Sequence, residues 1–307
     1  MDPLVIVFGL GVGILIGLTG IGGGSLMTPL LIVFAGVKPT IAIGTDLAYG
    51  AITKSVGGWR HWRKGTIDFG VSKWLAVGSL PGSLAGVWML ERLHDRYGLG
   101  FEDTLLLCVA GALLVVSISI LARALFMPKL VAAERDSVTL TGAVKASAVG
   151  IGLVLGLILG LTSVGSGALI GLALILVFKL TPHRVVGTDV FHAAVLLWAA
   201  GFAHLVAGNV DFALMGSILL GSVPGVWIGT GLITRVPATG LRVTLACVLL
   251  GSALGVASKG GVDVPVGLIV GAPAAAGVLS YFILRGRPAS APIPEPPLPA
   301  PPALENV

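Results

Sequence analysis

Long runs without a charged residue alternate with short charged loops along this chain. Uncharged runs cover 3–37, 104–122, 146–178, 212–234 and 264–284. A bilayer core of about 30 Å is crossed by about 20 helical residues. The pattern therefore predicts an all-α fold, a polytopic transmembrane helical bundle. We expect segments at 3–18, 25–35, 39–58, 69–90, 104–125, 141–160, 168–178, 186–207, 212–233, 242–258 and 265–284.

The chain repeats itself at a fixed spacing of 143 residues. Aligning 9–92 with 152–235 gives 27 identities in 84 positions without a gap, which indicates a duplicated unit. The clearest matches are Gly17-Leu18-Thr19 with Gly160-Leu161-Thr162, and Gly44-Thr45-Asp46 with Gly187-Thr188-Asp189.

Each repeat contains five predicted segments, and an odd number makes the second repeat enter the membrane upside down. Loop 59–68 carries Arg60, Arg63 and Lys64, whereas the equivalent loop 202–211 carries no Lys or Arg. The positive-inside rule then places the N-terminus outside and the C-terminus in the cytoplasm. Alternatively, each short segment forms one broken crossing with its predecessor, which would give a parallel repeat.

This reading divides the chain into four parts. We expect a first transmembrane repeat at 1–140, a second and inverted repeat at 141–260, an additional transmembrane helix at 261–286 and a Pro-rich disordered tail at 287–307. Eight of the twenty residues from Pro288 onward are Pro, a composition typical of an extended, solvated segment.

Two of the uncharged runs are too long for one helix and must break. Runs 3–37 and 146–178 each contain a glycine cluster, at 20–24 and 165–167, which predicts interrupted or re-entrant helices. Such a break is tolerated at membrane depth only where it is buried in protein or lines a cavity. The N-terminus of the following short helix favours negative charge, so the breaks predict an anion site. The alternative is that these glycines only allow close helix packing.

The anion site would use backbone donors and hydroxyl groups. The candidate substrate-binding residues are Thr19, Gly22, Gly23, Gly24 and Ser25 in the first repeat, Thr162, Ser163, Gly165, Ser166 and Gly167 in the second, and Thr45 and Thr188.

Asp46 and Asp189 interrupt otherwise apolar segments. An ionisable residue there costs roughly 2.5 to 3.5 kcal/mol on insertion scales. They either couple transport to protons or organise the site, or they cap a helix after a break at the preceding Gly-Thr pair. His192 takes the position of Tyr49 and is either a polar bundle contact or a coupling residue.

Composition agrees with a membrane protein and adds little chemistry. Hydrophobic residues make up 55% of the chain, charged residues 11%, and the mean hydropathy is +1.02. We read the net charge of +5 as topological, so nucleic acid is not an expected partner. Lys54, Lys73 and Lys145 are expected to snorkel to the cytoplasmic face without a transport role. No cofactor and no metal are expected, and the oligomeric state is not predicted.

The glycine motifs identify a family. The segment 17–24, followed by Pro29-Leu30, and its repeat at 160–167 resemble the TauE/SafE family of sulfite and organosulfonate exporters. The resemblance covers roughly residues 5 to 284. It implies a multi-pass permease of the prokaryotic inner membrane, not an enzyme, that exports small anions such as sulfite, sulfoacetate or a related sulfonate by alternating access.

Other readings remain open from the residues alone. A cradle of backbone donors would also suit carboxylates or inorganic anions. An intramembrane hydrolase using Ser166 with His192 or His204 is disfavoured, because Ser166 has only Gly23 at its repeat position. A channel would differ by passing ions without saturation.

Overall fold

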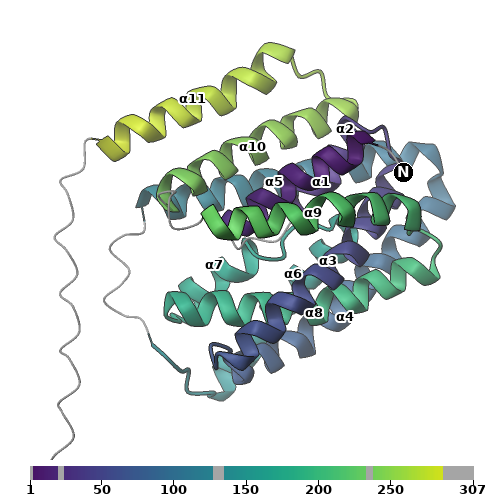
Figure 1. Cartoon of the computed structure of the whole chain (residues 1–307). Coiled ribbons are helices and arrows are strands. Elements are labelled where there is room, and N and C mark those ends of the chain that lie inside the picture. Colours follow the sequence, from purple (N-terminus) through teal and green to yellow (C-terminus); the bar gives the residue numbers. More distant parts are fainter. Residues whose placement is uncertain (1–2, 20–23, 127–134, 233–237, 286–307) are drawn as a thin grey trace, which may run out of the picture.

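The structure is a computed structural model that describes residues 3–19, 24–126, 135–232 and 238–285. These residues form an all-helical bundle, whose only bridge of the β type pairs Arg135 with Leu180 within the described part (Figure 1). The predicted all-α class is confirmed. The helices are α1 (Pro3–Thr19), α2 (Gly24–Val33), α3 (Pro39–Arg63), α4 (Phe69–Tyr97), α5 (Leu99–Phe126), α6 (Gly142–Thr162), α7 (Leu169–Leu176), α8 (Pro182–Val206), α9 (Phe212–Leu232), α10 (Ala238–Lys259) and α11 (Val266–Arg285).

Every predicted segment corresponds to one of these helices, although some ends differ. Helix α8 begins at Pro182, four residues before the predicted start, because Pro is favoured at the first helical turn. Helix α4 continues to Tyr97, beyond the predicted end at residue 90. The Pro-rich tail predicted at 287–307 lies outside the described residues.

The two repeats start their helices with the same local signals. Pro39 opens α3 and Pro182 opens α8, each at the start of the first turn. Asp68 caps α4 by accepting a hydrogen bond from the Val71 N–H at 3.0 Å. At the equivalent position, Asp211 accepts from the Leu214 N–H at 2.9 Å before α9 begins. These side chains satisfy backbone donors that the first turn leaves free.

Glycine ridges hold the longest helix pairs together. Gly78, Gly82 and Gly86 of α4 lie against the backbone of α6, and Gly152 and Gly156 of α6 lie against α4. A Cβ atom at any of these positions would overlap backbone atoms of the neighbouring helix. Small residues at a four-residue spacing therefore let the helix axes approach closely, as in many membrane bundles.

The same ridge occurs a second time between α9 and α1. Gly221 and Gly225 of α9 face α1, while Gly9 and Gly13 of α1 face α9. All four glycines are repeat equivalents of ridge residues in α4 and α6. Each ridge therefore joins one helix of the first repeat to one helix of the second.

Helices α3 and α8 occupy equivalent positions and pack against each other in opposite directions. As the chain moves along α3 from Ala48 to Gly57, the facing residue moves back along α8 from Gly201 to Val190. Near the middle of this contact, the Trp198 indole N–H donates to the Ser55 hydroxyl at 2.8 Å. The pair is thus antiparallel and forms another direct contact between the repeats.

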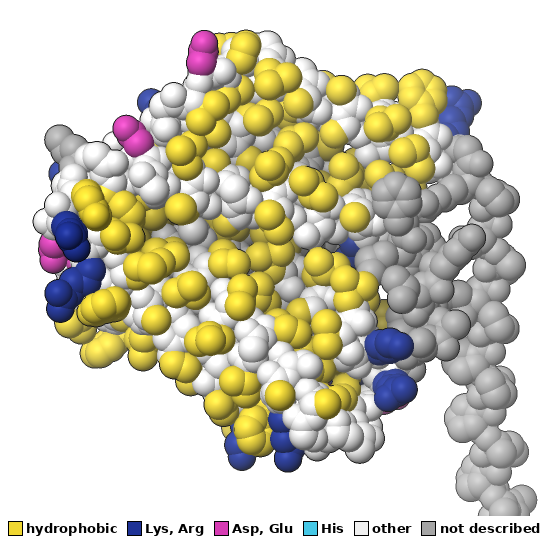
Figure 2. Space-filling model, turned by 180° about the vertical axis from the view of Figure 1, so that it is seen from behind, with side chains coloured by type: hydrophobic (Ala, Val, Ile, Leu, Met, Phe, Trp, Pro, Cys, Tyr) yellow, Lys and Arg dark blue, Asp and Glu magenta, His cyan; other side chains and the backbone are white. Residues whose placement is uncertain are grey.

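Six described helical stretches are long and apolar enough to cross a membrane: Gly100–Leu125, Gly142–Thr162, Pro182–Val206, Phe212–Gly229, Gly240–Lys259 and Val266–Arg285. Many large apolar side chains face outward, such as Trp227, which is 83% exposed, and Val266, which is 76% exposed. Figure 2 shows hydrophobic side chains spread across one face, with Lys and Arg side chains gathered near its edges. This distribution suits a protein surrounded by lipid.

The helices that follow the two breaks are too short to cross a bilayer. Helix α7 has 8 residues and α2 has 10, which correspond to about 12 and 15 Å at 1.5 Å per residue. Both are nevertheless largely buried within the bundle. Their short length places the ends of each helix at positions where a substrate inside the protein could meet them.

Candidate functional site

The second glycine-rich break is an irregular turn between α6 and α7. Ser163 ends α6 in the left-handed conformation, with φ of 59°, and Gly165 and Gly167 have φ of 122° and 107°. A side chain at either glycine would be strained, which explains why glycine is used there. The hydroxyl of Thr162 accepts from the Val164 N–H at 3.2 Å and donates to the Ile158 carbonyl at 2.6 Å. Thr162 therefore supports the turn.

Several polar groups of this turn have no partner among the described residues. The backbone N–H groups of Gly165 and Ser166 donate no hydrogen bond within that part of the chain. The Ser166 hydroxyl is buried and is also without a partner there. Buried donors usually find an acceptor. The turn therefore presents donors that an anion could accept from.

The first break lies mostly outside the described residues. Gly22 and Gly23 lie in the segment that is not described, and the side chain of Thr19 is not described either. Gly24 begins α2, and the hydroxyl of Ser25 in its first turn is buried and has no partner among the described residues. Each break thus contributes a serine hydroxyl that is available for a ligand.

Asp46 joins the two repeats. Its Oδ2 atom accepts from the Thr28 hydroxyl of α2 at 2.6 Å and from the Ser163 hydroxyl of the second break at 2.9 Å. The side chain is fully buried, and Oδ1 has no partner within the described residues. One carboxylate therefore fixes α2 and the second break relative to α3.

Asp189 is equally buried but has different neighbours. The backbone of Gly167 lies next to its carboxylate, and Lys54 and Arg123 attract it electrostatically. Its Oδ1 has no hydrogen-bond partner among the described residues. Asp189 thus sits between the second break and positive charge. The two aspartates mark the two ends of the same turn, because Ser163 contacts one and Gly167 approaches the other.

The helix-capping interpretation of both aspartates is wrong. Gly44, Thr45 and Asp46 lie inside the continuous helix α3, and the equivalent triplet 187–189 lies inside α8. Neither Gly-Thr pair interrupts its helix, so neither carboxylate caps a first turn. The glycines are needed for packing instead, since a Cβ atom would overlap Asn209 at position 44 and Thr66 at position 187.

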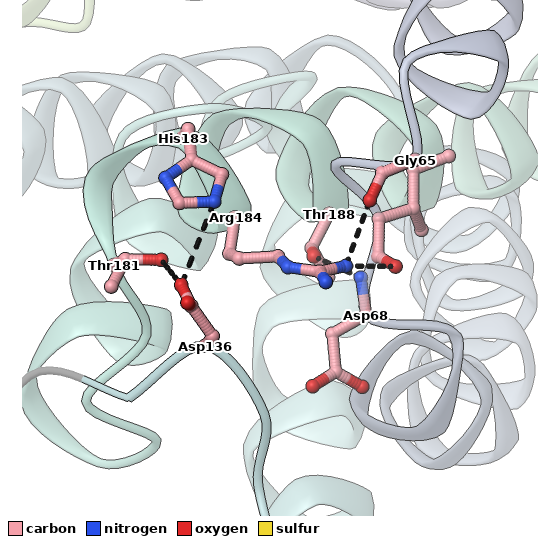
Figure 3. A network of polar contacts seen from close by, with 8 residues as sticks. Gly65, Asp68, Asp136, Thr181, His183, Arg184 and Thr188 are labelled. Carbon is pink, nitrogen blue, oxygen red and sulfur yellow. Dashed lines mark hydrogen bonds and ion pairs between the residues drawn. The ribbon is translucent and has the colours of Figure 1, made fainter. Parts of the chain in front are cut away.

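Thr45 and Thr188 make equivalent contacts with the start of the other repeat's long helix. The Thr188 hydroxyl accepts from the Asp68 N–H at 2.8 Å, and the Thr45 hydroxyl accepts from the Asp211 N–H at 3.0 Å. Figure 3 shows the first of these bonds beside Arg184, whose guanidinium donates to the Gly65 carbonyl at 2.9 Å. Both threonine hydroxyls are therefore engaged within the protein.

Lys54 is the functional candidate that the sequence interpretation missed. We predicted that this side chain would snorkel to the surface. That prediction is wrong, because the residue is only 7% exposed. The ammonium group has no hydrogen-bond partner among the described residues. Asp189 and Asp46 attract it electrostatically, in that order of strength. A signal was present in the sequence: Lys54 follows Asp46 by eight residues, so both lie on one face of α3.

The histidines make internal contacts. The Nε2 atom of His192 lies 3.1 Å from the Ser79 hydroxyl, while its Nδ1 is buried without a partner in the described chain. His204 lies 3.2 Å from the Gly160 carbonyl through Nε2. The Ser166 hydroxyl has no bond to either ring within the described residues, so the alternative of a hydrolase that pairs Ser166 with His192 or His204 is not supported there.

The arrangement concentrates hydrogen-bond donors and one buried positive charge around a break in the membrane-embedded helices. The described residues contain no group of three or more His, Cys, Asp or Glu side chains suited to holding a metal ion. Free N–H groups, hydroxyls and an ammonium can bind an anion by direct hydrogen bonds.

An all-helical membrane bundle with interrupted helices around a buried polar centre is an architecture typical of membrane transporters. The family model described as "Sulfite exporter TauE/SafE" matches residues 5–256. The chain therefore belongs to the TauE/SafE family, and the predicted resemblance is confirmed.

Relatives agree with this assignment. The chain is 41% identical over 254 residues to the probable membrane transporter protein YjnA of Bacillus subtilis (strain 168), covering 83% of this chain and 99% of that one. It is 27% identical over 230 residues to the probable membrane transporter protein YdhB of the same organism, covering 75% and 89%. No solved structure matches the chain.

Proposed function

We propose that this protein is an inner-membrane permease that exports small sulfur-containing anions, such as sulfite, sulfoacetate or a related organosulfonate, by alternating access. The membership in the TauE/SafE family supports the transport role. The proposed substrate lies between the two glycine-rich breaks, where it accepts from Ser25, Ser166 and the N–H groups of Gly165 and Ser166.

The observation that carries this proposal is the buried ammonium of Lys54. Lys54 is only 7% exposed, and its ammonium group lacks a hydrogen-bond partner in the described chain. A positive charge buried in this way is costly unless a ligand pairs with it. Asp189 and Asp46 partly offset the charge. A bound anion would pair with the Lys54 ammonium and would replace the two aspartates as its counter-ion.

Alternating access is supported by the way the repeats are packed. The equivalent helices α3 and α8 are antiparallel, so a two-fold axis that exchanges them must run perpendicular to both. If both helices cross the bilayer, that axis lies in the membrane plane, as in transporters with inverted repeats. The arrangement supports inverted repeats, and the proposed orientation, with the N-terminus outside and the C-terminus in the cytoplasm, rests on the Lys and Arg residues of loop 59–68.

Labelling of single cysteines tests this orientation directly. Cysteines placed at Arg63 in the last turn of α3 and at Val206 in the last turn of α8 should react from opposite sides of the membrane. The measurement uses a membrane-impermeant maleimide on intact cells and on inverted vesicles. Labelling of both positions from the same side would rule out inverted repeats.

The direction of transport has a sufficient energy source. An inside-negative potential drives an anion outward by about 2.3 kcal/mol per charge per 100 mV. A uniporter would therefore need no coupling ion. Asp46, Asp189 and His192 are then proposed as residues that organise the site, with proton coupling as the alternative that pH-dependent flux would reveal.

The test is flux of radiolabelled sulfite into and out of proteoliposomes containing the purified full chain. Lys54→Met should reduce the rate at limiting substrate by about tenfold or more, because a hydrogen bond to a charged group contributes roughly 1.5–3 kcal/mol. Lys54→Arg should retain part of the rate. Lys73→Met is the matched control, since Lys73 is exposed on α4.

Competing anions sharpen the substrate assignment. Sulfoacetate should inhibit sulfite flux, and acetate should inhibit weakly. Equal inhibition by acetate would move the assignment to carboxylates. A folded Lys54→Met protein with wild-type flux would overturn the proposed site, and formation of a cleaved product from any of these compounds would overturn the assignment as a permease.

A further inference from the structure

Two arginines meet beside the second break. Arg123 in the last turns of α5 and Arg242 in the first turns of α10 line a small cavity together with Ser119, Ile120, Ala168 and Leu172. The enclosed space is about 10 Å³, enough for roughly one water molecule. Both arginine side chains are partly buried. The cavity is therefore narrow in this conformation and is lined by two charged side chains.

Within the part of the chain that the structure describes, the charges in this cavity are not balanced by close ion pairs. Neither guanidinium forms a hydrogen bond or an ion pair with another residue of the described chain, and the two repel each other. Asp189 attracts Arg123 only at a distance. Two like charges brought together in a partly buried place are unfavourable. A negatively charged ligand between them would remove the repulsion and supply an acceptor for both.

The surrounding backbone also favours an anion. Ala168 lines the cavity and is the N-cap of α7, where it provides no side-chain cap, so the positive end of this helix lies beside the cavity. Arg123 approaches Gly171 in the first turn of α7: a Cβ atom there would lie in ordinary van der Waals contact with Nη1, at 3.8 Å. Three sources of positive potential thus converge on one small volume.

We infer that Arg123 and Arg242 form a second anion site, which binds an oxyanion carrying two or more oxygens, such as sulfite, a sulfonate, sulfate or phosphate. A guanidinium presents a planar fork that matches paired oxygens, which an ammonium does not. The arginines separate to admit the ion. The site lies beside Ala168, directly after the second break, and, given the proposed transport function, it is where a cytoplasmic anion binds before it reaches the centre.

Chemical modification of arginine tests this site in the full-length protein in detergent micelles. The Lys54→Met variant is treated with phenylglyoxal with and without sulfite, sulfate or inorganic phosphate, and modified peptides are quantified by mass spectrometry. At an anion concentration ten times its Kd, modification of Arg123 and Arg242 should slow by about tenfold. Arg92, which is exposed on α4, is the internal control and should react at an unchanged rate.

A second variant separates binding from folding. Arg242→Gln should abolish protection of Arg123 and raise the KM for transport about tenfold, since one charge-assisted hydrogen bond is lost. Arg92→Gln should leave both unchanged. Unprotected arginines, or equal protection of Arg92, would overturn the second site even if sulfite is transported. Protection by sulfate or phosphate without any sulfite transport would retain the second site and overturn the proposed substrate.

Discussion

The two repeats share a scaffold but differ in the polar groups that they bring to the centre. The glycine ridges, the aspartate caps and the Thr45 and Thr188 bonds occur in both halves. The positively charged side chain near the centre is not repeated in this way. Position 54 is Lys in the first repeat and the equivalent position 197 is Leu. The residues of the scaffold are therefore repeated in both halves, whereas polar residues of the candidate site differ between them.

The two aspartates show this difference most clearly. Thr28 donates to Asp46, whereas the equivalent of Thr28 in the second repeat is Gly171, which has no side chain. The space left at Gly171 is instead approached by Arg123, which attracts Asp189. One carboxylate is thus held by hydroxyl groups and the other by positive charges. Equivalent residues can therefore have unequal roles.

The largest expected effect breaks the shared scaffold. Gly156→Val and Gly13→Val should each destabilise the protein by roughly 3 kcal/mol or more, because the new side chain would overlap the backbone at Ser79 or Ser222. Thermal unfolding of detergent-solubilised protein measures the effect. Gly150→Val and Gly11→Val on the same helices are controls, since both glycines face open space. A large loss for one ridge only would show that the ridges are not equivalent.

A smaller effect is expected at the aspartates, and here the repeats should differ. Asp189→Asn removes a counter-charge of Lys54, so we expect anion binding to tighten about tenfold and release to slow. Asp46→Asn keeps an oxygen that can accept from Thr28 or Ser163 and should change binding less. Anion titrations and flux across pH measure both. Equal effects would contradict the division of roles, and loss of pH dependence in either variant would support proton coupling.

The smallest effect sharpens the symmetric side of the comparison. Thr45→Val and Thr188→Val each remove one hydrogen bond to a backbone N–H and should lower the free energy of unfolding by about 1 kcal/mol. Because the two bonds are equivalent, the two losses should agree within measurement error. Transport at saturating substrate should be unchanged. A selective loss of transport in either variant would indicate that the threonine hydroxyl binds the substrate.

The elements of the fold could be predicted from the sequence because their signals are local. Uncharged runs and the repeated motif located the eleven helices of the described residues, although the start of α8 at Pro182 was placed four residues too late. The continuity of α3 through Gly44 could not be read in this way, since a glycine that breaks a helix and one that allows a neighbour to approach look alike in sequence. The close contact with Asn209 decides the case.

The candidate site was predicted in part. Asp46 and Asp189 were identified by their insertion cost, but the bond from Ser163 to Asp46 joins residues 117 positions apart. No local pattern reports such a contact. Lys54 was misjudged because the rule that lysine reaches the surface depends on which face of the helix it occupies. Its alignment with Asp46 on α3, facing the apolar helix α8, indicates burial.

The glycine ridge between α1 and α9 also has a consequence for how the chain is made. Gly9 emerges from the ribosome long before its neighbour Ile218, by about 200 residues, or about 10 to 40 s at 5–20 residues per second. During that interval α1 is inserted without the helix that fits its ridge. The first half therefore stays in the bilayer with the glycine ridge of α1 unpaired. Biogenesis of this protein depends on this ridge remaining accessible until the second half has been synthesised.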